Sequence, residues 1–215
     1  LNSFKLAIKN ITKFHQKQFP RNFEINKNNS VIGSLWKPIE SVGLYVPGGK
    51  ASYPSSLLMS VIPAKVAGVE RIAIVTPSTN GYINPYITSL ADILDIKEIY
   101  QVGGPQAIAA LAFGTSSIRS VNKIFGPGNA YVASAKKQVF GKVGIDLIAG
   151  PSEIVVVADK DNNPDWVASD LIAQAEHDEK AKSILITDDE GFAKDVSKSV
   201  RKFMKLLPKQ ETIEK

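Results

Sequence analysis

The sequence contains no cysteine. This absence excludes disulfide bonds, thiolate metal sites and a cysteine nucleophile, and with the nucleophile it excludes aldehyde oxidation through a thiol. Histidine is limited to His15 and His177, and His15 has no metal-ligand neighbour at helical spacing, so it is left out of the candidate site. No uninterrupted apolar segment reaches membrane-spanning length and no signal-peptide pattern opens the chain, which predicts a cytoplasmic protein without a membrane partner.

The composition is that of an ordinary globular α/β protein. With 215 residues and 44% hydrophobic residues, the chain can bury a real core in one large or two modest domains. The net charge of +5 is local, because residues 1–40 hold 7 Lys or Arg against 2 acidic residues. Basic residues interleaved with exposed aromatic residues are missing, so no nucleic-acid partner is predicted.

The basic residues of the first segment follow a helical period. Their spacing predicts a solvated helix face opposite an apolar one, and the helix ends near Gln18 because Pro20 and an Asn-rich stretch to Ser30 follow it. The solvated face carries Lys5, Lys9, Lys13 and Lys17, and the apolar face carries Phe4, Ile8, Ile11 and Phe14.

Strand and helix patterns then alternate along the chain. This order predicts an α/β fold with mainly parallel sheets covered on both faces, and a site at the carboxyl ends of the strands. The helix predicted over residues 132–139 carries Lys136 and Lys137 outward. Strands are predicted over 41–46, 72–76 and 99–102, and helices over 55–67, 86–94 and 107–113.

Glycine-rich turns follow several of these patterns. Tyr45 precedes Pro47-Gly48-Gly49, where it could set its ring against a base or ribose or simply lie in the core. Gly103 to Gln106 follows a predicted strand and opens a helix, a geometry that presents free backbone N–H groups to phosphate. Neither this turn nor Gly126 to Asn129 has the GxGxxG spacing, so nucleotide binding and plain turns both remain open.

The stretch from Leu147 to His177 is the most distinctive part of the chain. A Gly-Pro-Ser turn leads into a buried strand over residues 154–158, and Asn163 caps a helix whose last turn holds Gln174 and His177. These two side chains lie three apart on one face, and an amide oxygen and an imidazole nitrogen are both possible zinc ligands. Zinc requires three or four protein atoms, and a plain polar helix end is the simpler interpretation of the same pattern.

Several longer stretches extend the pattern. These stretches are SVGLYVPGG at 41–49, SSLLMSVIPAKVAGV at 55–69, VGGPQAIAALAFGT at 102–115, KIFGPGNAYV at 123–132, GPSEIVVVAD at 150–159 and DWVASDLIAQAEH at 165–177. Through them, from about Leu6 to the last residue, the chain resembles histidinol dehydrogenases.

The alternation and the resemblance together predict two incomplete Rossmann-like units. Residues 45–152 form an inserted unit that binds NAD, and residues 1–44 with 153–215 form the unit that carries the zinc-site helix. The resemblance implies NAD contacts at Tyr45, Gln106 and Asn129, substrate contacts at Ser152, Gln174 and His177, and zinc ligands at Gln174 and His177.

In this family, L-histidinol is oxidised through L-histidinal to L-histidine while NAD is reduced, and the enzyme is a homodimer. The resemblance also implies a catalytic Glu-His pair and two further zinc ligands, an Asp and a His, none of which this sequence supplies; its one Glu-His pair, Glu176-His177, belongs to the zinc motif. We therefore expect a fragment without the N-terminal segment and the C-terminal half, without catalytic residues of its own and inactive alone. Exposed apolar surface is expected beside the helix that bears His177, where the absent half would pack.

Two other functions fit the residues. A relative with the same scaffold could oxidise another alcohol, such as sulfopropanediol. A non-catalytic α/β module could bind a nucleotide or a partner subunit.

Overall fold

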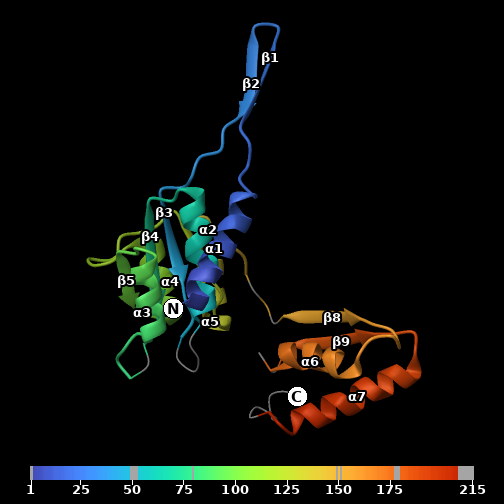
Figure 1. Ribbon diagram of the computed structural model, residues 1–215. Coiled ribbons are helices and arrows are strands. Elements are labelled where there is room, and N and C mark those ends of the chain that lie inside the picture. Colours follow the sequence, from blue (N-terminus) through green and yellow to red (C-terminus); the bar gives the residue numbers. More distant parts are fainter. Residues whose placement is uncertain are drawn as a thin grey trace. The chain divides into compact units, whose positions relative to one another are not determined.

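The computed structural model describes residues 2–48, 53–78, 80–148, 150, 152–176 and 180–207. The chain divides into two compact units, Leu1–Ala149 and Gly150–Lys215 (Figure 1). Both units combine parallel strands with covering helices, which confirms the predicted α/β class with mainly parallel sheets. No helix among the described residues is both long enough and apolar enough to cross a membrane.

The first unit is built on a five-stranded parallel sheet. Its strands are arranged in the order β5-β4-β3-β6-β7, so the chain begins in the middle, adds two strands on one side and then two on the other. The strands are β3 (Ser41–Tyr45), β4 (Arg71–Thr76), β5 (Glu98–Gln101), β6 (Lys123–Phe125) and β7 (Gly144–Ile145).

Alternating side chains give this sheet two buried faces. Val42 and Leu44 of β3 pack into one core with α2 (Pro54–Ala67) and α3 (Pro85–Ile93). Tyr45 packs on the opposite face with α4 (Gly104–Phe113) and α5 (Ala130–Val139). Because successive side chains of a strand point to opposite faces, one short apolar strand serves both cores.

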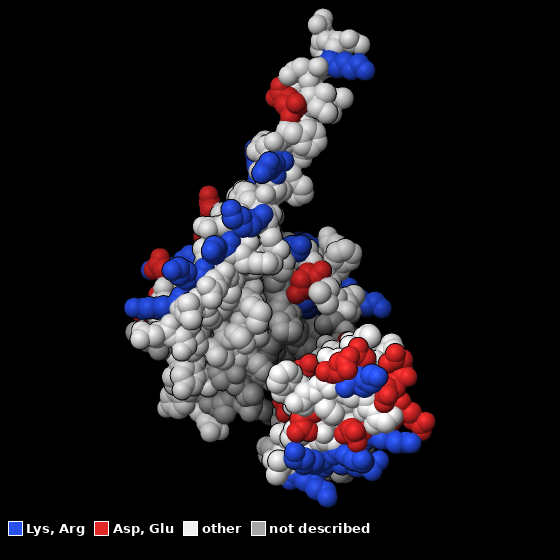
Figure 2. Space-filling model, turned by 45° about the vertical axis from the view of Figure 1, so that its right-hand side comes forward, with Lys and Arg blue, Asp and Glu red and all other residues white. Residues whose placement is uncertain are grey.

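The N-terminal helix α1 (Asn2–Gln16) packs against α2. Phe4, Ile8 and Ile11 lie against the first core as predicted, whereas Phe14 is 61% exposed. The predicted solvated face of lysines is confirmed, because all four are exposed, and Figure 2 shows basic side chains standing out from the first unit. An antiparallel hairpin of β1 (Phe23–Lys27) and β2 (Ser30–Ser34) follows the helix.

The second unit is smaller. Two parallel strands, β8 (Glu153–Val157) and β9 (Lys182–Ile186), carry α6 (Pro164–Ala175) and α7 (Glu190–Met204). Val156 and Leu185 pack against the helical core, while the alternate side chains of both strands are exposed. This sheet is therefore covered on one face by the described residues.

The contacts group the residues differently from the predicted boundary at Tyr45. Residues 41–44 pair with β4 in the same sheet as Tyr45, and α1 packs on α2 within the first unit. A strand cannot be divided between two sheets, so the first unit begins before Tyr45. The predicted grouping of residues 1–44 with residues 153–215 around an inserted unit stays a prediction.

Candidate functional site

The strand order of the first unit reverses direction between β3 and β6. From β3 the chain continues to β4 and β5 on one side, and to β6 and β7 on the other. In open α/β sheets, the loops leaving two such strands part from each other and leave a crevice beyond their carboxyl ends, where ligands bind. The loops concerned are residues 46–48 and residues 126–129.

Tyr45 is the last residue of β3 and lies on one side of this reversal. Its side chain is only 5% exposed and belongs to the core, while its hydroxyl oxygen accepts a hydrogen bond from the backbone N–H of Gly104 over 3.1 Å. Gly104 has φ +68 and begins α4. The tyrosine therefore fixes the glycine turn after β5, and its hydroxyl still has one proton to donate.

Gln106 lies in the first turn of α4 and is exposed. Its Oε1 lies 2.7 Å from the position that a Cβ on Gly104 would take, so this amide rests on the same turn as the Tyr45 hydroxyl. The N-cap residue Gly103 has no side chain to cap α4, the Tyr45 hydroxyl accepts from the N–H of Gly104, and Pro105 has no N–H. The N–H of Gln106 is therefore the donor of the first turn that an anion would find at the carboxyl edge of the sheet, where the helix dipole also favours negative charge.

Asn129 lies on the other side of the reversal, after β6. Its Oδ1 accepts hydrogen bonds from the N–H groups of Tyr131 and Val132, both over 3.1 Å, and so caps α5. Its Nδ2 is the remaining hydrogen-bonding end of an exposed side chain.

Gly126 connects the two sides of the reversal. It has φ +120, and a Cβ there would lie 2.1 Å from the carbonyl oxygen of Tyr45, so glycine alone fits. The turn that leads to Asn129 therefore lies directly against Tyr45. The three residues predicted to contact NAD, at the end of β3, in the first turn of α4 and at the cap of α5, follow strands β3, β5 and β6 at one edge of the sheet.

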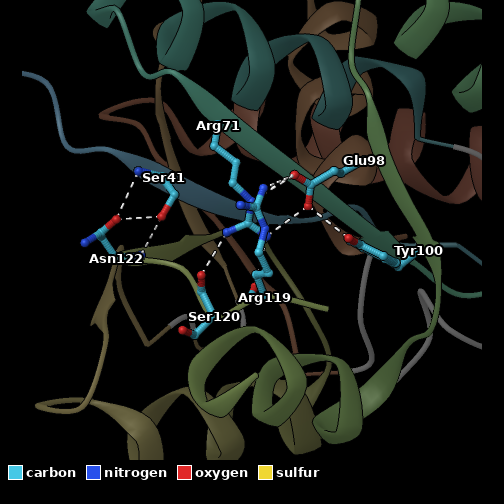
Figure 3. Close-up of polar contacts among 7 residues, drawn as sticks. All are labelled: Ser41, Arg71, Glu98, Tyr100, Arg119, Ser120 and Asn122. Carbon is cyan, nitrogen blue, oxygen red and sulfur yellow. Dashed lines mark hydrogen bonds and ion pairs between the residues drawn. The ribbon is translucent and has the colours of Figure 1, made fainter. Parts of the chain in front are cut away.

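The opposite edge of the same sheet holds a closed polar network (Figure 3). Arg71 forms a two-pronged ion pair with Glu98, with nitrogen to oxygen distances of 2.8 and 2.9 Å, and donates to the backbone oxygens of Arg119 and Ser120. Tyr100 donates its hydroxyl proton to Glu98 over 2.9 Å. These donors, Arg71 first, lower the pKa of Glu98 to about 2 against desolvation, which alone would raise it.

A second contact at this edge joins β3 to the segment before β6. The Oδ1 of Asn122 accepts from the backbone N–H and the hydroxyl of Ser41 over 3.0 and 2.5 Å.

Burial and the neighbouring Glu98 raise the pKa of Tyr100, so its phenol stays protonated near neutral pH. The groups of this edge satisfy one another and stabilise the start of the strands, which leaves the carboxyl edge as the candidate site.

The residues predicted to hold zinc and substrate belong to the second unit. Ser152 is exposed and directly precedes β8, and Gln174 is half-buried in the last turn of α6. His177 lies outside the described residues. No group of three or more His, Cys, Asp or Glu side chains suited to a metal ion occurs among the residues that the structure describes.

The predicted cap of α6 is confirmed, because the Oδ1 of Asn163 accepts from the N–H of Asp165 over 2.8 Å. Exposed apolar surface occurs in this unit, but on the face of β8 and β9 opposite α6 and not beside the helix as expected. We call it the bare sheet face. Its side chains are Val155, Val157, Ile184 and Ile186, with exposed fractions of 54%, 77%, 44% and 53%.

The predicted outward direction of Lys136 is wrong. Its side chain is 3% exposed, because it reaches under the turn at Gly126 and meets Asp146, which follows β7. Lys137 is exposed as predicted. The helical spacing contained the signal. Lys136 lies four residues after Val132 and three before Val139, on the buried face of α5, whereas Lys137 is turned about 100° away from it.

Comparison with known proteins covers the whole chain. The family model for histidinol dehydrogenase matches residues 1–215. The chain is 56% identical over 213 residues to a histidinol dehydrogenase of Rhizobium meliloti, covering 99% of this chain and 49% of that protein. For one of Brucella suis the identity is 57%, again over 99% of this chain and 50% of the relative.

A solved structure agrees with these sequence matches. The crystal structure of histidinol dehydrogenase from Elizabethkingia anophelis superposes with a TM-score of 0.93 at 42% identity, and covers 97% of this chain and 49% of that one. The chain thus spans about half the length of the relatives that it matches. With the family model matching from the first residue to the last, the chain belongs to the histidinol dehydrogenase family.

Proposed function

We propose that this chain is the NAD-binding part of an enzyme that oxidises L-histidinol through L-histidinal to L-histidine, the last step of histidine biosynthesis. Family membership supports the reaction. Nucleotide binding by this part of the chain is supported by the reversal of strand order between β3 and β6, with glycine turns at the carboxyl edge of the sheet.

NAD would lie across this edge. The N–H of Gln106 in the first turn of α4 suits the pyrophosphate, and the side-chain amides of Gln106 and Asn129 suit polar groups of the dinucleotide. Tyr45 would act at the base of the site, since its ring is buried and its hydroxyl supports Gly104. NAD itself supplies the acceptor for the hydride that leaves the alcohol carbon.

We further propose that Ser152, Gln174 and His177 contact the substrate and that Gln174 and His177 bind zinc. The described residues do not fit a zinc site by themselves, because Gln174 offers one neutral oxygen and zinc requires three or four protein atoms. A complete site would need ligands beyond those that the described residues bring together, and we derive no step of the reaction through the metal.

The chain alone should bind the dinucleotide without turning over. Proton removal from the alcohol and activation of water both require a positioned base, and the sequence contains no Glu-His pair apart from Glu176-His177. We propose that the whole enzyme is a cytoplasmic homodimer. Histidinol-dependent NADH formation by the purified 215-residue protein would contradict the proposed inactivity.

Calorimetric titration of the chain with NAD tests the nucleotide site. We expect saturable binding, and Gln106→Ala should weaken it about fivefold, the effect of one lost hydrogen bond of ~1 kcal/mol. Gln138→Ala is the matched control, because it removes an exposed glutamine from α5, whose contact is with Ser134. Wild-type protein that binds no NAD would refute the proposed nucleotide site.

Zinc is tested separately on the same protein. We expect the chain to bind zinc weakly, and Gln174→Ala to leave NAD binding unchanged, because the two predicted sites use different residues. Tight stoichiometric zinc binding by the 215-residue protein would show that its own residues complete a metal site, against the proposal.

A further inference from the structure

Lys136 is a buried charge that the proposed function leaves unused. It is 3% exposed in the middle of α5, and the other buried polar or charged side chains of the described residues, Ser41 and Thr76, are uncharged. Taking an ammonium group out of water costs several kcal/mol unless its surroundings compensate. An apolar side chain would fill this place at lower cost, so the contacts of the ammonium group must account for its presence.

The ammonium group holds the turn at the strand reversal. Lys136 forms an ion pair with the carboxylate of Asp146 and donates a hydrogen bond to the carbonyl oxygen of Gly126 over 3.0 Å. The other oxygen of Asp146 accepts from the N–H of Gly126 over 2.8 Å. Both backbone polar groups of one glycine are therefore bound by a single ion pair, which we call the Gly126 clamp.

The clamp acts where the turn has least room. Gly126 has φ +120 and lies against the carbonyl oxygen of Tyr45, and a Cβ on Gly128 would lie 2.3 Å from Val132. Asn129 closes the turn by capping α5, the helix in which Lys136 itself lies. The turn is thus bound at its start by the clamp and at its end by the cap.

We propose that Lys136 and Asp146 are positioning residues that hold the turn from Gly126 to Asn129 in the shape that receives NAD. The inference rests on the proposed function, since it assigns a role at the same nucleotide site. Neither side chain touches the ligand. Their contribution is preorganisation, because a turn that is already ordered loses less conformational freedom when the dinucleotide binds.

The test compares NAD affinity among four proteins by calorimetry. Lys136→Met keeps most of the aliphatic stem and removes the charge, and should weaken NAD binding tenfold or more. Lys137→Met makes the same change on the exposed neighbour and should bind NAD like the wild type. Val139→Ala loosens the packing of α5, where Val139 is 5% exposed, without removing a group that contacts the turn.

A spectroscopic signature separates positioning from general stability. The Gly126 N–H binds a carboxylate, and in nitrogen-15 spectra without NAD its resonance should move in Lys136→Met and stay in place in Val139→Ala. The absence of cysteine permits a chemical rescue. Lys136→Cys can be alkylated with bromoethylamine while unfolded and then refolded, which gives a side chain of nearly the same length that ends in an ammonium group. This protein should bind NAD with an affinity within about threefold of the wild type.

The outcomes separate this inference from the proposed function. Wild-type protein without NAD affinity overturns both. If Lys136→Met binds NAD as tightly as the wild type, or if Val139→Ala weakens NAD binding as much as Lys136→Met does, the inference is overturned and the proposed nucleotide site is retained. Should Lys136→Met not fold, Asp146→Asn carries the same test, because it retains an amide oxygen for the Gly126 N–H and removes the charge from the pair.

Discussion

The network at the amino edge of the sheet makes a prediction that can be worked from the structure. Glu98→Gln removes one negative charge and leaves the shape of the side chain unchanged. Glu98 is 21% exposed at its side chain and binds Arg71 through both oxygens, and Tyr100 also donates to it. In the variant, one amide oxygen can still accept from Arg71, but the charged two-pronged pair is lost and Arg71 keeps its bonds to the backbone oxygens of Arg119 and Ser120.

The magnitude follows from the pKa of Glu98. It lies at about 2 in the folded protein against an ordinary 4.5, and each pKa unit corresponds to ~1.4 kcal/mol, which sets an upper bound of about 3 kcal/mol at neutral pH. Solvent screening of the partly exposed carboxylate reduces this to about 1 to 2 kcal/mol. Because the folded pKa is lowered, the contribution is complete well above pH 4.5 and is lost as the pH falls toward 2.

Hydrogen exchange measured by mass spectrometry on peptides of β3 to β5 reports on the first unit alone. At pH 7, Glu98→Gln should lower the free energy of opening by about 1 to 2 kcal/mol, and the difference from wild type should shrink between pH 5 and pH 2. Glu70→Gln is the control, because it removes an exposed carboxylate beside Arg71. A difference between Glu98→Gln and wild type that stays constant down to pH 2 would refute the reasoning.

Two further predictions concern packing and capping. A Cβ on Gly43 would lie 2.7 Å from Leu111, which is fully buried. Measured by urea unfolding, Gly43→Ala should lower the free energy of unfolding by about 1 to 3 kcal/mol and Leu111→Ala by about 2 to 5 kcal/mol. The double variant should lose clearly less than the sum, because the smaller side chain at 111 makes room for the added methyl group. Additive costs would show that the two positions do not compete for space. Asn163→Ala removes the cap of α6 and should cost ~1 kcal/mol, measured by hydrogen exchange in α6, with no effect on α4; unchanged exchange in α6 would contradict the capping role.

The periodic parts of the fold were predictable because burial imposes a period on the sequence. The strand of Ser41 to Tyr45 is apolar on both faces because helices cover both, and that composition is visible without a structure. The hairpin of β1 and β2 was not predicted. Its residues are exposed apart from the half-buried Ser34, so burial imposes no requirement on them.

A turn signal for the hairpin is nonetheless present. Asn28 and Asn29 have φ of +49 and +62, values that a two-residue hairpin turn requires and that asparagine adopts more readily than most residues. The alternation of Phe23 and Ile25 with polar residues belongs to the same hairpin. The sequence therefore contained a local indication of the hairpin, although burial could not reveal it.

The difference between the two sheets explains which functional predictions this chain can support. The first sheet reverses its strand order between β3 and β6, so its loops form the edge of a nucleotide site with residues of the chain itself. The pair of β8 and β9 has no such reversal, and its bare sheet face is apolar among the described residues. Parallel sheets are usually covered on both faces. The roles proposed for Ser152 and Gln174 therefore depend on residues beyond those described, whereas the roles of Gln106, Asn129 and the Gly126 clamp depend on contacts already formed.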